Sequence, residues 1–214
     1  MFVLYWTAVP LILTGNYARA TAFANELYSL ADEKGATPWR VSGSLNQGIL
    51  FALTGKTSSA VQMITSGITA LRPMGFTLGA PWWSSHLAIA HGNLGQLDDA
   101  YRCVGEAISI IDTSKERWCE AEVNRLAGQL ALIGPKPDTT KAEAYFERAL
   151  LVARAQQAKS WELRASMSLA RLWRDQGKVH QARELLAPVY GWFTEGFDTR
   201  DLKEAKALLE ELAV

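Results

Sequence analysis

Apolar residues recur three or four positions apart through most of the chain, and glycines interrupt this spacing at regular places. Around Gly95 the apolar positions run through residues 82–94 on one side and 97–111 on the other. This spacing predicts two amphipathic helices joined by a turn. Gly95 ends the first helix because glycine adopts the left-handed conformation at little cost. Asp98 and Asp99 favour the start of the second, where carboxylates complement the positive helix end.

The same glycine is followed five residues later by alanine, and this pair recurs along the chain. The copies are Gly15–Ala20, Gly55–Ala60, Gly95–Ala100 and Gly177–Ala182. The first three glycines lie 40 residues apart, and the fourth lies 82 further on, about two more periods. A period of this size is typical of stacked repeats rather than of one closed core, and such arrays usually bind rather than catalyse. The small alanine predicts a close crossing of the two helices.

The unit without this glycine–alanine pair has an enlarged turn, Gly134–Thr140, in which two prolines exclude helix. A tryptophan marker supports the register, since Trp39, Trp118 and Trp161 each stand nine residues before a small residue. We expect these three tryptophans to lie near the starts of their helices and to be buried against the preceding hairpin. The predicted repeats cover residues 2–36, 38–74, 80–113, 115–157 and 159–194, and a capping helix covers 199–212, all in a single domain of residues 1–214.

Within each hairpin the order of small and large residues resembles the tetratricopeptide repeat. The shared order is Leu-Ala/Gly, a large residue three positions on, Gly, and Ala five positions after it, and the third and fifth units match best. Their period of about 40 exceeds the typical ~34, so the match is to a tetratricopeptide-like array rather than to the strict consensus. The resemblance implies an all-α, right-handed solenoid of about five helical hairpins with a C-terminal capping helix.

The C-terminal half resembles a narrower group. The strings that carry this resemblance are Glu120–Leu130, Ala144–Arg154, Ser160–Ala165, Ser168–Trp173, Tyr190–Thr199 and Asp201–Leu209. In large bacterial signalling proteins, a class III adenylate/guanylate cyclase or winged-helix domain precedes a regulatory ATPase and then such an array. The resemblance implies that this region belongs to a larger cytoplasmic chain, which would be a nucleotide cyclase or a transcriptional regulator. No cyclase or ATPase motif lies in these residues, so no catalytic residue is carried over.

Charge and end composition refine this picture. The chain has 22 Lys/Arg and 22 Asp/Glu, which argues against a nucleic-acid platform. Residues 1–95 contain only five Lys/Arg and three Asp/Glu. The predicted apolar end face comprises Phe2, Leu4, Tyr5, Trp6, Val9, Leu11, Ile12 and Leu13. We expect this face to pack on an upstream repeat or to support a weak homodimer. The alternative is a signal peptide or membrane anchor, but no basic segment leads it and 13 residues are too few to span a bilayer.

Several strings contain residue types that bind phosphate or metal or take part in catalysis. Thr54–Thr57 resembles the tail of a phosphate-binding loop, but position 50 is Leu50 where a second glycine is needed, so a turn containing Lys56 is favoured. His86 and His91 are five residues apart, which suits a shared metal poorly, and packing roles are favoured. We also expect His180 to be exposed, and Cys103 and Cys119 to be buried and unpaired. Glu120 and Glu122 diverge around their helix and form no acid/base pair. We therefore predict no catalytic residue, metal site or cofactor.

The remaining candidate is a surface formed by the first helices of the hairpins. The resemblance places groove residues at Ser42, Leu45, Ile49, Trp82, Ser85, Ile89, Asn93, Asn124, Gly128, Arg164, Met167, Arg171 and Arg174. Arg164, Arg171 and Arg174 at one end and Trp82 at the middle suit an extended or helical peptide with acidic residues. The alternative is that the arginines only pair with Asp175, Glu162 and neighbouring helices.

Two function classes follow. The first is a non-catalytic protein-interaction and regulatory module, and the second is a sensor that holds a small molecule or peptide. An enzyme is disfavoured because no nucleophile, metal set or phosphate loop is apparent in the sequence. Partners are expected to be proteins or other domains of the same chain, rather than nucleic acid or membrane.

Overall fold

Turns built around left-handed glycines set the architecture. In the computed structural model, which describes residues 1–213, the φ angles of Gly15, Gly55, Gly95 and Gly177 are 76°, 84°, 76° and 78°. In each turn the amide after the glycine donates back to the carbonyl four residues before it, as from Lys56 to Phe51 at 2.9 Å. This bond satisfies a carbonyl that the helix end would leave open. The predicted turns at these glycines are confirmed.

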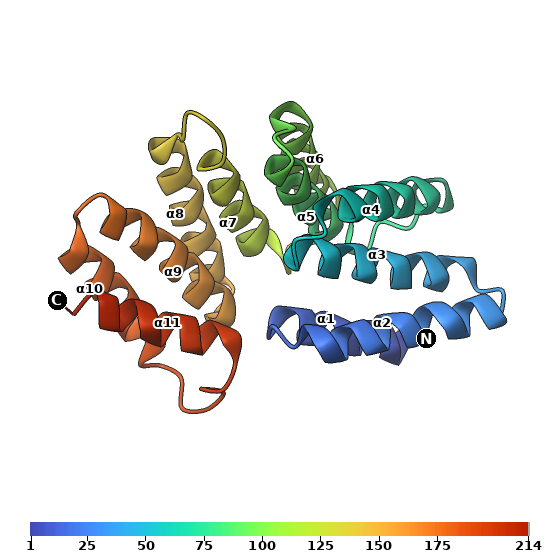
Figure 1. Ribbon diagram of the computed structural model, residues 1–214, viewed down its shortest axis with the longest axis horizontal. Helices are drawn as coiled ribbons and strands as arrows, with labels where there is room; N and C mark the ends of the chain where they lie inside the picture. Colours follow the sequence, from blue (N-terminus) through green and yellow to red (C-terminus); the bar gives the residue numbers. More distant parts are fainter. Residues whose placement is uncertain (214) are drawn as a thin grey trace. The chain divides into compact units, whose positions relative to one another are not determined.

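The described residues form eleven α-helices and one short 3-10 helix, with no strand among residues 1–213 (Figure 1). The helices are α1 (Phe2–Leu13), α2 (Tyr17–Glu33), α3 (Thr37–Leu53), α4 (Thr57–Leu71), η1 (Arg72–Met74), α5 (Ala80–Asn93), α6 (Leu97–Ser114), α7 (Glu120–Ala131), α8 (Thr139–Ala155), α9 (Lys159–Asp175), α10 (Val179–Tyr190) and α11 (Arg200–Glu211). They pair as five hairpins followed by one helix, so the predicted all-α repeat fold is confirmed.

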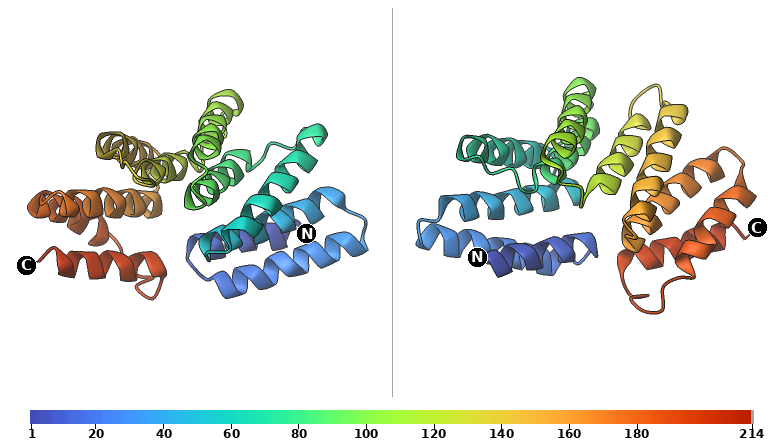
Figure 2. Two further views of the ribbon diagram at one scale, coloured as in Figure 1. Left: turned by 45° about the horizontal axis from the view of Figure 1, so that its top comes forward. Right: turned by 180° about the vertical axis from the view of Figure 1, so that it is seen from behind.

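The hairpins gather into two compact units, Met1–Lys115 and Glu116–Val214, which we call unit 1 and unit 2. In unit 1 the first helices α1, α3 and α5 contact one another in succession, and each also packs on its own second helix (Figure 2). In unit 2 the same succession runs through α7, α9 and α11. First helices therefore form one layer of each unit and second helices the other.

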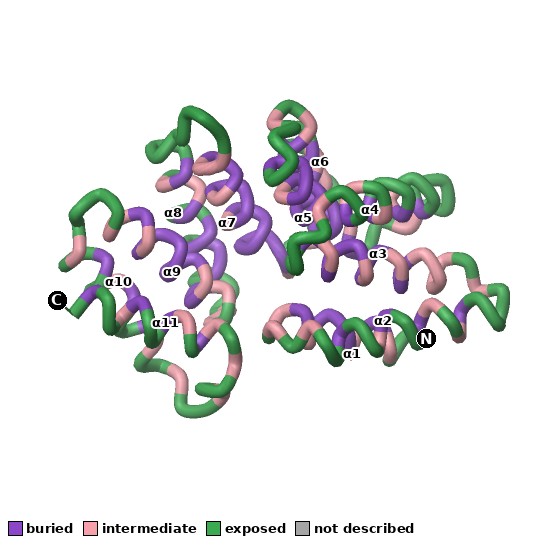
Figure 3. Tube along the Cα trace, in the orientation of Figure 1, coloured by how far each residue is buried: buried purple, intermediate pink, exposed green. Residues whose placement is uncertain are grey.

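Small residues allow this close packing. The turn alanines Ala20, Ala60, Ala100 and Ala182 are all fully buried, as the sequence predicts. Figure 3 shows the buried stretches of the helices in purple. Glycines inside helices act in the same way, because a Cβ on Gly67 would lie 2.6 Å from Leu45 and one on Gly128 would lie 2.5 Å from Phe146. The crossing of α7 with α8 therefore depends on Gly128.

The tryptophan marker and the fourth turn depart from the expectation in detail. Trp39 and Trp161 are the third residues of their helices, whereas Trp118 lies two residues before α7 begins. All three are half-buried rather than buried. The enlarged turn is shorter than predicted, because Asp138 accepts a hydrogen bond from the amide of Lys141 at 2.9 Å and so starts α8 at Thr139.

Two of the tryptophans contact the preceding hairpin as expected. Trp39 meets the rings of Phe2 and Tyr5 on α1, with centroids 6.2 Å and 6.3 Å away. Trp161 donates its indole N–H to the carbonyl of Trp118 at 3.1 Å. Each ring therefore ties one hairpin to the one before it.

The last helix closes the apolar core of unit 2. Leu202, Leu208 and Leu212 pack with Leu163 on α9 and Leu186 on α10. At the other end of the chain, α1 contains no charged residue, and Phe2 and Val3 are 62% and 72% exposed. Among the helices described, none has the length and apolar character needed to cross a bilayer.

Candidate functional site

The predicted groove residues of unit 1 lie mostly in its interior. Trp82 is 1% exposed and Ser85 is fully buried, while Asn93 is exposed at the end of α5. The ring of Trp82 lies 4.1 Å from that of His86, and both His86 Nδ1 and the Ser85 hydroxyl contact the Trp82 carbonyl at 2.9 Å. Trp82 and Ser85 therefore present no surface to a ligand in this arrangement, because α5 is covered nearly all round.

The groove positions on α3 are buried as well. Ser42, Leu45 and Ile49 are at most 1% exposed, and the Ser42 hydroxyl donates to the carbonyl of Pro38 at 2.8 Å. Next to them lies Asn46, whose amide nitrogen and oxygen are buried with no hydrogen-bond partner among the described residues. The only signal of this buried amide in the sequence is an asparagine on the apolar side of a helix.

In unit 2 the first-helix layer is charged, and its arginines are held by carboxylates. Arg164 on α9 pairs with Asp201 on α11 at 2.6 Å and with Glu122 on α7 at 3.4 Å. Glu122 also receives two hydrogen bonds from Arg125, at 2.7 and 2.8 Å. A chain of ion pairs thus crosses α7, α9 and α11.

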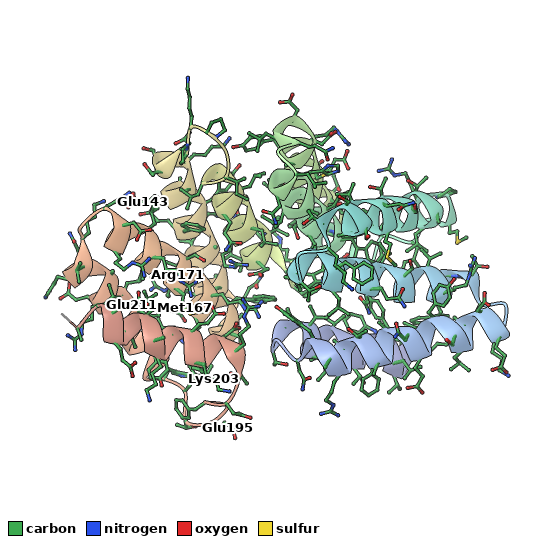
Figure 4. All side chains as sticks on the ribbon, in the orientation of Figure 1. Glu143, Met167, Arg171, Glu195, Lys203 and Glu211 are labelled. Carbon is green, nitrogen blue, oxygen red and sulfur yellow. The ribbon has the colours of Figure 1, made fainter. Side chains whose placement is uncertain are left out.

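The other two predicted arginines also meet α11. Arg171 lies 3.0 Å from Glu204, and Arg174 pairs with Glu211 and, at 2.9 Å, with Asp175 (Figure 4). These arginines therefore pair with Asp175 and with carboxylates of neighbouring helices, as the alternative expects. Arg171 and Arg174 keep 39% and 35% of their side chains exposed, so their guanidinium groups still reach the surface.

Glu162, the remaining expected partner, pairs elsewhere. Its carboxylate accepts from Arg154 at 2.9 Å and from Lys159 at 2.7 Å. Burial raises the pKa of this carboxyl, but the hydrogen bonds from Lys159 and Arg154 outweigh it, so the pKa of Glu162 is lowered. Glu120 is likewise held by Arg117 and Arg148, each at 3.1 Å. These carboxylates stabilise the fold rather than form an acid/base pair.

A hollow opens beside Arg171. It has a volume of about 330 Å³ and lies between α7, α8 and α9. Its lining combines apolar side chains with polar ones, namely Leu132, Phe146, Leu172, Thr139, Gln129, Ser168, Arg171, Asp175 and Gln176. Asp175 is the one acidic group, and it is already paired with Arg174. The hollow suits a carboxylate next to a small apolar group.

Two further predicted groove residues, Asn124 and Met167, are buried in unit 2. Asn124 is buried and donates its amide to the carbonyl of Glu120 at 2.8 Å. Met167, 3% exposed, packs in the core beneath α11 and is visible beside Arg171 in Figure 4. Neither presents a side chain to a partner, so among the predicted groove residues of unit 2 the arginines carry the accessible chemistry.

The residues of the phosphate-loop-like string, the histidines and the cysteines take structural roles or lie at the surface. Gly55 lies in the turn between α3 and α4, and Lys56 rests over the Phe51 ring at 4.9 Å, as expected of a turn residue. His91 Nδ1 contacts Gln96 at 2.7 Å across the next turn, and the side chain of His180 is 83% exposed. Burial raises the pKa of Cys103 to about 11 and that of Cys119 further, so neither thiol is ionised at neutral pH.

The fold and this site together define an all-α helical-hairpin repeat protein. No protein-family model matches the chain, and no curated protein matches it. Solved structures do resemble it, among them the nearly identical TPR-like repeats of a protein designated a kinesin light chain from Podosopora anserina. That structure is 13% identical, covers 98% of this chain and 94% of its own, and has a TM-score of 0.55. A single-substitution variant of it is 15% identical, covers 88% and 92%, and has a TM-score of 0.57. The chain therefore has a tetratricopeptide-like repeat fold.

Proposed function

We propose that this chain is a non-catalytic protein-interaction and regulatory module. It binds a partner segment bearing acidic residues at the surface of unit 2 that contains Arg171 and Arg174. The observation that carries the proposal is Arg171, a partly exposed cation that lines a hollow of about 330 Å³ together with Leu132, Phe146 and Leu172. A carboxylate can accept paired hydrogen bonds from a guanidinium, and the apolar side chains can receive a neighbouring apolar group.

The helix α11 supports the chemistry of this proposal. Its carboxylates Asp201, Glu204 and Glu211 already meet three arginines of α9. The surface is therefore compatible with an acidic helix lying along it. A guanidinium has five donors, so Arg171 and Arg174 have capacity beyond their present partners.

A partner would bind beside α11 rather than replace it. Leu202 and Leu208 of α11, and Leu212 directly after it, are at most 4% exposed. Burying a leucine side chain contributes roughly 1.5–3 kcal/mol, so removing all three would cost more than the exposed ion pairs return. The hollow beside Arg171 offers a site that leaves this core intact.

Binding of acidic and charge-neutral helical peptides, followed by fluorescence anisotropy, tests the proposal. Acidic peptides should bind at low salt, and Arg171→Gln should weaken them about tenfold because a charge-assisted hydrogen bond is lost. Arg183→Gln is the matched control, since Arg183 is an exposed arginine on α10 outside the hollow. Equal affinity for acidic and neutral peptides, or equal loss in both variants, would contradict the proposal.

We also propose that the module relays binding within a bacterial cytoplasmic signalling chain that has a nucleotide cyclase or transcriptional output. The support is the resemblance of the strings between Glu120 and Leu209, and the distant fold likeness adds nothing to it. Sequencing the complete reading frame tests this proposal directly. An upstream region that encodes neither an ATPase nor such an output domain would refute it.

We propose finally that α1 supports weak self-association. Phe2 and Val3 are exposed and Trp6 and Leu13 are half-buried, whereas Tyr5, Val9 and Ile12 of the predicted face belong to the core. An exposed apolar patch of this kind favours association. Sedimentation velocity across a concentration series should reveal a dimer that Trp6→Glu with Leu13→Glu abolishes. A wild-type chain that stays monomeric at high concentration would rule this out.

A further inference from the structure

A second hollow lies in unit 1, apart from the partner surface proposed for unit 2. It has a volume of about 660 Å³ and is bounded by α4, the link after η1, α5 and α6. Its apolar walls include Ile68, Phe76, Trp83 and Ile110. This volume is within the range of small-molecule sites, roughly 300–1,000 Å³.

Gly105, on the wall formed by α6, has no packing reason to be glycine. A Cβ at Gly43, Gly48, Gly67 or Gly128, also inside helices, would come within 3.1 Å or less of another atom. A Cβ on Gly105 would meet nothing within 4 Å, and its φ is not in the left-handed region. A glycine inside a helix destabilises it relative to alanine. The absence of a side chain at position 105 leaves the hollow open.

Two charged side chains, Arg72 and Glu106, line the hollow. Arg72 is exposed and forms no ion pair with any residue described. Glu106, the acidic group on the same wall, is paired with Arg102 at 3.2 Å. The wall thus offers an unmatched guanidinium next to an apolar cavity.

Trp83 adds a polar atom to this wall. The residue is 1% exposed, and its indole N–H has no hydrogen-bond partner among the described residues. A Cβ on Gly79 would lie 3.3 Å from this nitrogen, so the link covers the ring closely. A ligand that shifts the link would therefore be sensed at the Trp83 indole.

We propose that this hollow binds a small molecule with an aromatic or alicyclic body and one carboxylate. The apolar body would fill the space between Phe76, Trp83 and Ile110, and the carboxylate would pair with Arg72. The inference is independent of peptide binding at Arg171, which lies in unit 2. It gives the sensing alternative a defined location.

Nuclear magnetic resonance titration with a panel of aromatic carboxylates, led by 2-naphthoate, tests the proposal, with 2-naphthamide as the uncharged analogue. The Trp83 indole resonance, assigned through Trp83→Phe, should shift saturably. Arg72→Gln should weaken 2-naphthoate about tenfold and leave 2-naphthamide unchanged. Lys56→Gln, which removes a cation of unit 1 that does not line the hollow, should have no effect.

Gly105→Leu tests the proposal by filling the hollow, and Gly105→Ala is its matched control. Gly105→Leu should abolish binding while the melting temperature stays the same or rises, because leucine favours a helix, its Cβ meets no neighbour and the rest of its side chain enters the hollow. Gly105→Ala should retain binding. If Gly105→Leu does not fold, Ser109→Phe at an exposed position of the same wall replaces it. Binding that survives a folded blocking variant, or a panel that never shifts the Trp83 indole, would overturn the proposal.

Discussion

Units 1 and 2 share one repeat fold but bury different polar chemistry. Residues 1–115 contain seven Lys/Arg and seven Asp/Glu, whereas residues 116–214 contain 15 of each. The buried polar side chains of unit 1 are serines, an asparagine and histidines, such as Asn46 and His86. Those of unit 2 include Glu120, Glu122 and Glu162, each held by two cations. The repeat fold therefore specifies where apolar and small residues lie and leaves the buried polar groups free to differ.

The apolar core should be equivalent in the two units, and its loss is the largest expected effect. Phe146→Ala in unit 2 should lower the free energy of unfolding by about 3–5 kcal/mol, and Ile64→Ala in unit 1 by about 2–5 kcal/mol. Both side chains are at most 1% exposed. Urea denaturation measures both changes. A cost below 1 kcal/mol for one variant alone would show that the cores are not equivalent.

The tryptophans at the hairpin joints should contribute less, because they are only half-buried. Trp161→Ala should cost about 1.5–3 kcal/mol, since the ring packs near Ala121 and Val152 and its N–H reaches the preceding hairpin. Trp118→Ala should also lower the melting temperature. Differential scanning calorimetry checks both. If neither variant changes the melting temperature, the proposed tryptophan register is wrong.

The buried carboxylates predict that unit 2 is sensitive to acid. Because the folded-state pKa of Glu162 is lowered, its contribution is present above its unfolded pKa of about 4.3 and is lost as pH falls through the folded value. The pKa of Glu204 is lowered as well, because burial raises it but the interactions with Arg200 and Arg171 outweigh burial. The contribution of Glu204 therefore has the same pH dependence. Glu162→Gln should therefore lower the urea midpoint at pH 7 more than at about pH 3.

Glu195→Gln is the control for the acid effect, because Glu195 is exposed in the link before α11. This variant should leave the midpoint and its pH dependence unchanged. If Glu162→Gln costs the same at both pH values, the carboxylate makes no ionic contribution and the contrast between the units fails.

The smallest effect is expected at Lys56. Lys56→Ala removes one exposed contact with the Phe51 ring, worth about 0.5–1 kcal/mol at most. It should not alter any interaction with ATP or GTP, and the purified chain should hydrolyse neither. Equilibrium dialysis and a phosphate-release assay check this. Nucleotide binding that disappears in Lys56→Ala would revive the phosphate-loop interpretation.

Much of the fold could be predicted because its signals are local. The left-handed glycines, the small residues at crossings and the apolar spacing act within one hairpin, so Gly55 and Ala60 alone indicate a turn and a contact. Lys115 and Gln157 also adopt positive φ, at 62° and 55°, but no side-chain type announces this. Trp118 was misplaced because two residues of turn precede α7, and helix starts depend on capping contacts that the apolar pattern does not contain.

The candidate site was harder to predict because it depends on which elements meet. The sequence indicated Arg164, Arg171 and Arg174, but not that α11 would supply their carboxylates from 33 to 37 residues away. Trp82 was expected at a surface because its helix is a first helix, yet its burial follows from the packing of α5 on α3, α4 and α6. The hollow beside Trp83 had one sequence signal, a glycine at position 105 within an otherwise regular helix.

The enlarged turn of the fourth hairpin has a practical consequence. Between Ala131 and Thr139 the chain makes a longer excursion than the other hairpin turns, and α7 and α8 still pack closely through Gly128. Residues 134–138 are all exposed. Loop length costs little entropy once the ends are fixed, so this tip should accept an inserted fluorescent domain or an epitope tag. Such an insertion would report on binding from close to the hollow beside Arg171, because Leu132 and Thr139 at the two ends of this turn line it.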